Sequence, residues 1–130
     1  MPKIKSDMHV THLIFALILS GGCSSTFASG IKCPKGTKPN GEQTPEVSEA
    51  WCEKRSNGRV VQHGPYRAWW PNNRLGTSGQ YINGIPAGKW SGWHQNGKQQ
   101  GYEWFENGKV IKGQYWDAAG NKLDAKPTPP

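Results

Sequence analysis

The stretch Gly88-Lys-Trp-Ser-Gly-Trp-His-Gln-Asn-Gly97 decides the fold, because two tryptophans and an Asn-Gly pair stand together in one short segment. Asn-Gly beside aromatic runs is the strongest short-range signal for a β-hairpin, since a type I′ turn needs positive φ at both central residues. Aromatic residues also favour strands. The stretch therefore predicts antiparallel strands joined by tight turns.

The same signals recur on both sides of this stretch. Asn-Gly pairs stand at Asn57-Gly58, Asn83-Gly84, Asn96-Gly97 and Asn107-Gly108. Gly64-Pro-Tyr-Arg-Ala-Trp69 matches Gly88-Lys-Trp-Ser-Gly-Trp93 at an offset of 24, which places Asn73 where the next copy has glycine. Asn is the next best residue at positive φ. A third copy begins at Gly113 and decays toward Asn121, as terminal repeats often do.

These repeats predict an all-β fold, a single elongated antiparallel β-meander of stacked hairpins over residues 57–123, with no helix apart from the signal peptide. The recurring glycines leave room for a neighbouring ring to cover bare backbone. Trp69 follows Tyr66 by three residues, and Trp93 follows Trp90 by three, so regular strands would carry rings on both faces. A bulge, with Gly92 as its site, is the alternative.

The repeats resemble the MORN-type repeat (membrane occupation and recognition nexus) in its bacterial variant. The residues that carry the resemblance are Trp69-Trp-Pro-Asn-Asn73, Gly79-Gln-Tyr-Ile-Asn-Gly84, Gly88–Gly97, Trp104-Phe-Glu-Asn-Gly108 and Gly113-Gln-Tyr115. The resemblance implies an elongated sheet of stacked hairpins and no enzymatic activity. Some bacterial members carry an antitoxin label. In most systems an antitoxin meets its toxin in the cytoplasm, and that location disagrees with the export signal of this chain.

The first 22 residues have the layout of a secretory signal peptide. Lys3 and Lys5 precede the apolar run 13–19, which is too short to span a bilayer, and small residues follow it. Leu19-Ser-Gly-Gly-Cys23 resembles a bacterial lipobox, although its Leu stands four rather than three residues before the Cys. The resemblance implies lipidation of Cys23 and, with Ser24 next, an outer-membrane lipoprotein facing the periplasm. The alternative is cleavage after Ala28, giving a periplasmic or secreted protein.

The remaining cysteines organise the rest of the chain. If Cys23 carries lipid, residues 23–32 form a flexible tether, and Cys33 and Cys52 are left as a pair in an oxidising compartment. Their spacing matches no compact zinc pattern, so we expect a disulfide that staples residues 33–56 into a loop capping the first strand. Residues 124–130 read as a disordered tail.

Composition and motifs argue against several classes of function. The net charge is +7, but the basic residues are scattered, so we expect no nucleic-acid partner. The sequence contains no nucleophile elbow, zinc-protease motif, P-loop or dinucleotide fingerprint, and we expect no cofactor and no metal site. Glu103 and Glu106 fall on opposite faces of a regular strand, which weakens a glycosidase reading.

The sequence therefore favours a non-enzymatic binding or scaffolding module at the cell envelope. Its partner would be an envelope protein, a lipid headgroup or a glycan, in addition to the membrane held through the lipid anchor. We expect most rings to stabilise the sheet, and the candidate contacts among them are Trp69, Trp70, Trp90, Trp93, Trp104 and Trp116. An antitoxin or immunity-type protein and a secreted effector are alternatives. A small envelope hydrolase that uses Glu103, Glu106 or His94 is a further one.

Overall fold

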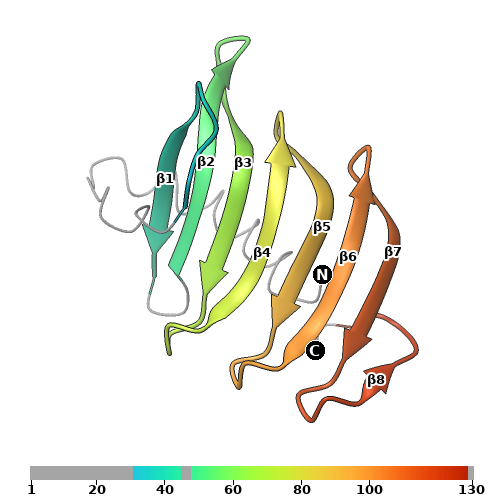
Figure 1. Ribbon diagram of the computed structural model, residues 1–130. Helices are drawn as coiled ribbons and strands as arrows, with labels where there is room; N and C mark the ends of the chain where they lie inside the picture. The colour runs from blue at the N-terminus through green and yellow to red at the C-terminus, as the bar shows by residue number, and fades with distance from the viewer. Residues whose placement is uncertain (1–30, 45–47, 129–130) are drawn as a thin grey trace.

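The computed structural model describes residues 31–44 and 48–128, which form one antiparallel sheet with its strands in chain order (Figure 1). The eight strands are β1 (Lys38–Gln43), β2 (Ser48–Ser56), β3 (Arg59–Trp69), β4 (Leu75–Ile82), β5 (Ile85–Trp93), β6 (Gln99–Glu106), β7 (Lys109–Trp116) and β8 (Lys122–Leu123). The predicted all-β meander is confirmed. This part of the chain holds no helix that is long and apolar enough to cross a membrane.

Three of the Asn-Gly pairs form the predicted type I′ turns. They join β2 to β3, β4 to β5 and β6 to β7 at one end of the strands. Their asparagines Asn57, Asn83 and Asn107 have φ of 51°, 50° and 50°, and the glycines that follow have φ of 76°, 83° and 76°. Both central residues are therefore left-handed, as a type I′ turn requires. We call these three turns the Asn-Gly tips.

The turns at the other end of the strands are of a different kind. They span 70–74, 94–98 and 117–121, and in each the fourth residue has positive φ: Asn73, Gly97 and Gly120 at 62°, 88° and 97°. The first N–H of each turn donates to the fifth carbonyl. Asn96-Gly97 thus departs from the type I′ expectation, because only its glycine is left-handed. The prediction that Asn73 takes the positive-φ position held by glycine in the next copy is confirmed.

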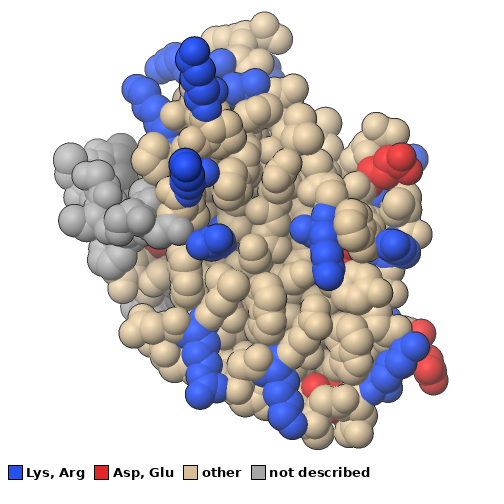
Figure 2. All heavy atoms as spheres, viewed as in Figure 1, with Lys and Arg blue, Asp and Glu red and all other residues tan. Residues whose placement is uncertain are grey.

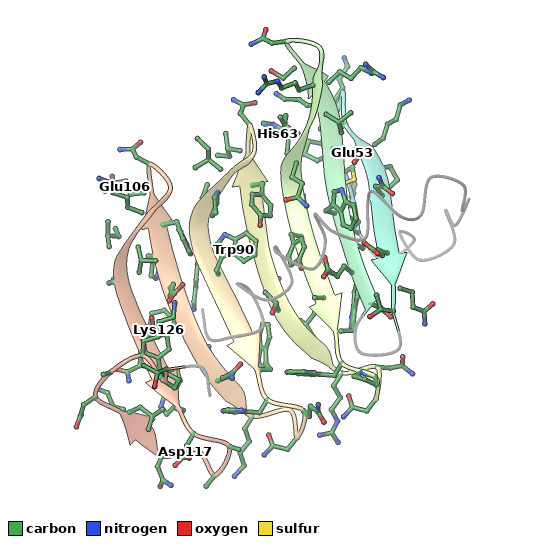
Figure 3. All side chains as sticks on the ribbon, turned by 180° about the vertical axis from the view of Figure 1, so that it is seen from behind. Glu53, His63, Trp90, Glu106, Asp117 and Lys126 are labelled. Atoms are coloured by element: carbon green, nitrogen blue, oxygen red, sulfur yellow. A yellow bond between two sulfur atoms is a disulfide. The ribbon has the colours of Figure 1, made fainter. Side chains whose placement is uncertain are left out.

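One face of the sheet carries the aromatic core (Figure 3). Trp51, Tyr66, Tyr81 and Trp90 are buried there, and Phe105 packs against them. The centroids of the Trp90 and Tyr81 rings lie 4.9 Å apart in an edge-to-face arrangement. We call this face the core face. Its stability comes from ring packing rather than from aliphatic side chains, as the composition suggests.

Glycines make room for these rings. A Cβ on Gly79 would stand 2.0 Å from the Trp90 ring, and one on Gly101 would stand 2.7 Å from the ring of Tyr115. The Trp90 indole nitrogen also donates to the carbonyl of Gln80 at 3.1 Å. The expectation that rings cover bare glycine backbone is therefore confirmed.

Rings on both faces explain the three-residue spacing, because Tyr66 and Trp90 belong to the core. The β3–β4 register shifts between Ala68 and Trp69, and the β5–β6 register shifts between Gly92 and Trp93, but the residue passed over is on the partner strand in each case, Gly76 or Gln100, and not Gly92. Ala68 belongs to the core face, so Trp69 lies on the opposite one.

The segment 33–56 is more regular than the expected capping loop. Cys33 and Cys52 form the predicted disulfide, with a Cα–Cα distance of 5.6 Å. The segment nevertheless contains β1 and β2, which pair from Lys38 with Glu53 to Gln43 with Ser48. Strand formation in a segment of weak β propensity follows from pairing and burial, since Ala50, Trp51 and Cys52 are all buried in β2.

The C-terminal segment also differs from expectation. Residues 124–128 lie within the described part of the chain, and Lys126 Nζ pairs with Glu103 Oε1 at 2.8 Å. The Tyr115 hydroxyl donates to the same carboxylate oxygen at 2.6 Å. Because Glu103 is 1% exposed, a charged partner is needed to hold it there. This contact disagrees with predicted disorder at Lys126, and residues 129 and 130 of the predicted tail lie outside the described residues. The signal peptide, the tether to Gly30 and Cys23 lie outside the described residues.

Candidate functional site

A row of polar residues crosses the face opposite the core face. Arg67, Ser78, Ser91, Tyr102 and Gln114 are successive partners in the registers from β3 to β7. Side chains alternate along a strand, so this row points away from Trp90 and its neighbours. We call this side the front face, and Figure 2 shows it.

The right-hand half of the front face carries a compact group of rings and ammonium groups on β5, β6 and β7. Because side chains alternate along a strand, the residues two positions before and after each member of the polar row also point to the front face. We call this group the front patch, and it consists of Lys89, Ser91, Trp93, Tyr102, Trp104, Lys112, Gln114 and Trp116. Every member comes from a strand interior or strand end, so the rigid sheet positions them all.

Contacts within the front patch fix its rings. Lys89 Nζ lies 4.8 Å from the centroid of Tyr102, and Lys112 Nζ lies 5.0 Å from that of Trp104. The Tyr102 and Trp116 centroids are 6.1 Å apart. An exposed cation–π contact contributes about 0.5–1 kcal/mol, enough to bias the lysine side chains toward the rings. The result is a surface on which rings and ammonium groups lie side by side.

Charge is distributed unevenly between the two faces. Lys and Arg side chains are spread over the front face, whereas Asp and Glu lie mainly toward its right-hand margin (Figure 2). Four strand carboxylates, Glu42, Glu49, Glu53 and Glu103, belong by strand alternation to the core face. Glu106, beside an Asn-Gly tip, is on the front face at its edge. The front patch therefore faces solvent with a positive charge.

The structure divides the six predicted contact tryptophans. Trp93 and Trp116 are half-buried members of the front patch, and Trp104 is 37% exposed there. Trp69 is half-buried on the front face of β3. These four rings reach the surface that we consider for partner binding.

The other two tryptophans both pack over glycines. Trp90 is 0% exposed, so the expectation that it contacts a partner is wrong: its ring fills the core over Gly79. Trp70 covers Gly76, where a Cβ would stand 3.1 Å from its indole nitrogen, and that nitrogen donates to the carbonyl of Trp93 at 2.9 Å. Trp70 therefore ties one turn to the next.

Sequence reasoning missed the non-tryptophan members of the front patch. Lys89, Ser91 and Trp93 share one face because they alternate along β5, and Tyr102 joins them through its pairing with Ser91. Counting in steps of two from Trp93 would have found Ser91 and Lys89. Tyr102 required the register of β5 against β6, which the sequence alone does not give.

On the core face, the carboxyl group of Glu49 has a shifted pKa. Glu49 stands opposite Glu42 in the β1–β2 register and is 7% exposed. Burial raises the pKa of Glu49 to about 7; the hydrogen bond from the Tyr66 hydroxyl opposes that shift, and the charge of Glu42 adds to it. Burial likewise raises the pKa of Tyr66 well above its ordinary value. Glu49 is thus largely protonated in mildly acidic solution.

The groups named for a hydrolase do not come together. Glu103 is buried on the core face with Lys126, whereas Glu106 lies at an Asn-Gly tip. His94 is in a turn at the other end of the strands, where its Nε2 lies 2.9 Å from the Trp116 carbonyl oxygen. No cluster of three potential metal ligands occurs within residues 31–44 and 48–128.

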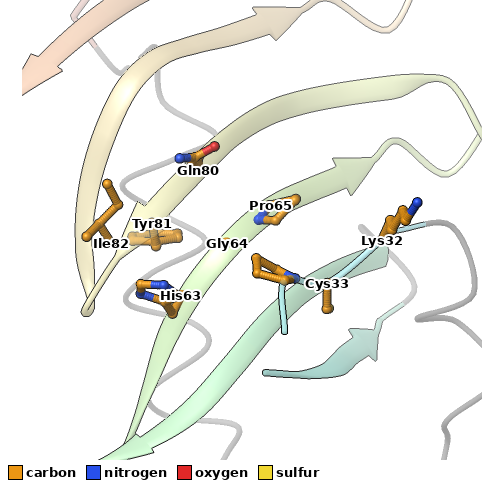
Figure 4. A pocket seen from close by; sticks show the side chains of 9 residues that line it. Lys32, Cys33, His63, Gly64, Pro65, Gln80, Tyr81 and Ile82 are labelled. Carbon is orange, nitrogen blue, oxygen red and sulfur yellow. The ribbon is translucent and has the colours of Figure 1, made fainter. Parts of the chain in front are cut away.

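A shallow hollow of about 490 Å³ lies beside the disulfide (Figure 4). Its wall includes Pro34, held by the neighbouring Cys33–Cys52 bond, and Gly64, where a Cβ would stand 2.8 Å from the Pro34 ring. His63 Nδ1 accepts from the N–H of Asn83 at 3.0 Å, which fixes the imidazole at the rim. The hollow has fewer rings than the front patch, and we assign it no role.

No family model and no curated protein matches the chain. The chain is similar to a solved structure of accessory secretory protein 1, 2 and 3 of Streptococcus pneumoniae, at 12% identity and a TM-score of 0.37, covering 84% of this chain and 21% of that one. It is also similar to the Glycosylation Associate Protein (Gap123) complex of Streptococcus agalactiae, at 17% identity and a TM-score of 0.38, covering 94% and 24%. This chain spans about a fifth to a quarter of those chains, and similarity at this level carries no conclusion about function.

Proposed function

We propose that the protein is a non-enzymatic binding module of the cell envelope, built of MORN-like repeats, which holds its partner on the front face. The observation that carries the proposal is the front patch itself. Its rings and ammonium groups lie side by side on one face of the sheet, and Trp104, between Lys89 and Lys112 in the register, is 37% exposed. Trp, Tyr and Arg dominate the binding energy of many interfaces, because large rings bury much surface at little entropic cost.

Two features support a location outside the cytoplasm. The Cys33–Cys52 disulfide suits an oxidising compartment, where such bonds form and persist. The signal-peptide layout of residues 1–22 is consistent with export, and Cys23 would supply the anchor. More than one acyl chain on that cysteine would make attachment stable, since a single chain binds membranes only marginally. We therefore propose an outer-membrane lipoprotein that presents the front face to the periplasm.

The binding role is tested with the mature protein purified from the cells that produce it. The protein is immobilised and incubated with solubilised cell envelopes. We expect Trp93→Ala to reduce retention of the bound material at least tenfold. Ile85→Ala serves as the matched control, because it also removes an exposed apolar group, but at an Asn-Gly tip. Equal retention by Trp93→Ala and the unchanged chain, or no retention by either, would refute the front-face proposal.

The anchor is tested separately by growth with a fatty-acid analogue. Label on the unchanged chain and none on Cys23→Ser is the expected result. Label that persists in Cys23→Ser, or no label on either chain, would contradict lipidation without touching the binding role.

A further inference from the structure

The front patch brings together three kinds of chemistry. Trp93 and Trp116 supply half-buried ring faces on alternate strands. Next to them, between the tryptophans and the lysines, the polar row supplies Ser91, Tyr102 and Gln114, which offer hydroxyl and amide groups. Gln114 Nε2 donates to the carbonyls of Tyr115 and Leu123, and these bonds orient its side chain. Lys89 and Lys112 supply positive charge at the opposite end of the patch.

Each kind of chemistry restricts the ligand. A ring face favours a flat apolar surface such as the C–H face of a sugar ring, because water is excluded from both. Neutral hydroxyl and amide groups pair with ligand hydroxyls without a strong requirement for charge. Ammonium groups favour an anionic group, such as a carboxylate. A sugar polymer that carries carboxylates satisfies all three.

The exposed aliphatic side chains argue against a lipid surface or an apolar protein on this patch. They cluster at the Asn-Gly tips, and the large ones are Val60, Ile82, Ile85, Val110 and Ile111. A membrane or an apolar protein surface would gain most by covering those side chains. None of them belongs to the front patch, which instead offers rings, polar groups and lysines.

The spacing indicates the size of the ligand. Trp93 and Trp116 lie on β5 and β7, which are two inter-strand steps, or about 10 Å, apart. Trp93 and Lys89 are four residues apart on β5, which corresponds to about 13 Å. A single sugar is too short to touch both ends of the patch, so the ligand must be an oligomer.

We propose that the front patch binds an acidic oligosaccharide, with sugar rings packed on Trp93 and Trp116 and carboxylates facing Lys89 and Lys112. This inference rests on the proposed binding function and names the class of its partner. The lysines that lie over Tyr102 and Trp104 are then both ring supports and anion contacts.

The test titrates the full chain, isotopically labelled, with oligogalacturonides from dimer to octamer and follows the indole N–H signals. We expect the signals of Trp93, Trp104 and Trp116 to shift, while those of buried Trp51 and Trp90 stay in place. The affinity should rise at least tenfold from dimer to octamer. Cello-oligosaccharides of equal length should bind at least fivefold more weakly. Absence of shifts, or equal affinity for the neutral series, would overturn the proposal.

Two further probes separate sugar recognition from attraction to any polyanion. Poly-L-glutamate presents carboxylates on a polypeptide, and phosphatidylglycerol vesicles present an anionic lipid surface. We expect neither to shift the same three indole signals. Either one doing so as strongly as the octamer would overturn the proposal in favour of that partner. If envelope material is retained in the pull-down but oligogalacturonides fail, only the partner class is wrong.

Variants give an independent test. Trp116→Ala should weaken octamer binding at least tenfold, and Trp116→Leu, which keeps apolar volume, should do the same if the ring face is the contact. Lys89→Gln with Lys112→Gln should weaken the acidic series at least fivefold and leave the neutral series unchanged. Arg59→Gln with Lys109→Gln removes the same charge near the Asn-Gly tips and should change affinity less than twofold. An equal loss of affinity in that control pair would show that net charge alone causes the effect, and it would overturn the proposal.

Discussion

Gly79 has no side chain because the Trp90 ring occupies the space where one would stand. A Cβ there would lie 2.0 Å from the ring, which is itself wedged between Tyr66, Tyr81 and Phe105. The ring cannot retreat, since its nitrogen is bonded to the Gln80 carbonyl. The packing of the Trp90 ring thus requires glycine at this position of β4.

We predict that Gly79→Ala destabilises the protein by about 2–3 kcal/mol or more, because overpacking a filled core forces rings and backbone to shift. Urea unfolding measures the change. Gly58→Ala is the comparison: it also adds one methyl group, at a tip with nothing within 4 Å, and should cost about 1 kcal/mol for its positive φ alone. A loss at Gly79 no larger than at Gly58 would contradict the packing argument.

A second prediction at the residue scale concerns Glu49. Burial raises its pKa from 4.5 to about 7, so between these values the folded chain binds more protons than the unfolded chain. Stability should be greatest below pH 4.5, fall as pH rises toward 7, and be level above, with a total loss on the order of 3 kcal/mol.

Urea unfolding from pH 4 to 8 measures this dependence, with Glu49→Gln as the control. The amide keeps an oxygen that accepts from the Tyr66 hydroxyl but does not titrate. The two stability curves should therefore diverge between pH 4.5 and 7 and run parallel, separated by the lost stability of Glu49, above pH 7. Curves that are parallel over the whole range would show that another group is responsible.

At the scale of elements, the turns at 70–74, 94–98 and 117–121 form a ladder that locks one repeat to the next. Asn72 Nδ2 donates to the Gln95 carbonyl at 2.9 Å, and Asn96 Nδ2 donates to the Ala118 carbonyl at 2.7 Å. Lys98 Nζ reaches the Ala119 carbonyl at 2.8 Å. In the last turn the hydrogen bonds stay within the turn, because the Asp117 carboxylate accepts from the backbone N–H and the side-chain amide of Asn121. The ladder thus ends in a turn whose side chains form hydrogen bonds with each other rather than with a further turn.

We predict that Asn96→Ala lowers the free energy of unfolding by about 1 kcal/mol, because it removes the bond to Ala118 and the Oδ1 acceptor of the Lys98 N–H. Thermal and urea unfolding measure the change. Gln95→Ala, in the same turn, should be nearly neutral, since Gln95 joins the ladder through its backbone carbonyl. Equal losses from both substitutions would argue against the ladder.

The disulfide supports the first hairpin. Cys52 is fully buried in β2, and Cys33 holds Pro34 over Gly64 of β3. We predict that Cys33→Ala with Cys52→Ala destabilises the chain by about 3 kcal/mol in the chain-entropy model. Reduction should lower the unfolding midpoint of the unchanged chain and leave that of the double variant where it is. A reductant effect of equal size in both chains would place its cause elsewhere.

Elements differ in how far the sequence predicts them. The Asn-Gly tips and the rings over glycine could be predicted because each depends on local chemistry: positive φ in one case, missing side chains in the other. The β1–β2 hairpin and the fold-back of Lys126 onto Glu103 could not, because pairing and ion-pair contacts with distant residues decide them. Only part of the front patch could be predicted. Its tryptophans recur with the sequence repeat, but the position of Tyr102 depends on the register of β6 against β5.

For the molecule as a whole, the meander makes each strand depend mainly on its two neighbours. The rings of Tyr66, Tyr81, Trp90 and Phe105 link β3 to β6 on the core face. At the two ends the support is weaker, because β1 borders one strand only and β8 has two residues. The front patch, on β5 to β7, thus lies partly over the best-packed region, which favours a preorganised surface.

This gradient predicts the pattern of native-state hydrogen exchange. Arrays in which each unit contacts only its neighbours open from their ends, so local opening should need less free energy there than at the centre. Amides of β4 and β5 should exchange slowest, those of β7 faster, and those of β1 and β8 fastest. Trp90→Leu should raise the exchange rates of β4 and β5 toward those of β7, whereas Trp104→Leu, which alters an exposed ring of the front face, should leave the profile unchanged. Uniform protection from β1 to β8 would instead mean that the sheet opens only as one cooperative unit, with the disulfide and the turn ladder joining its ends to its centre.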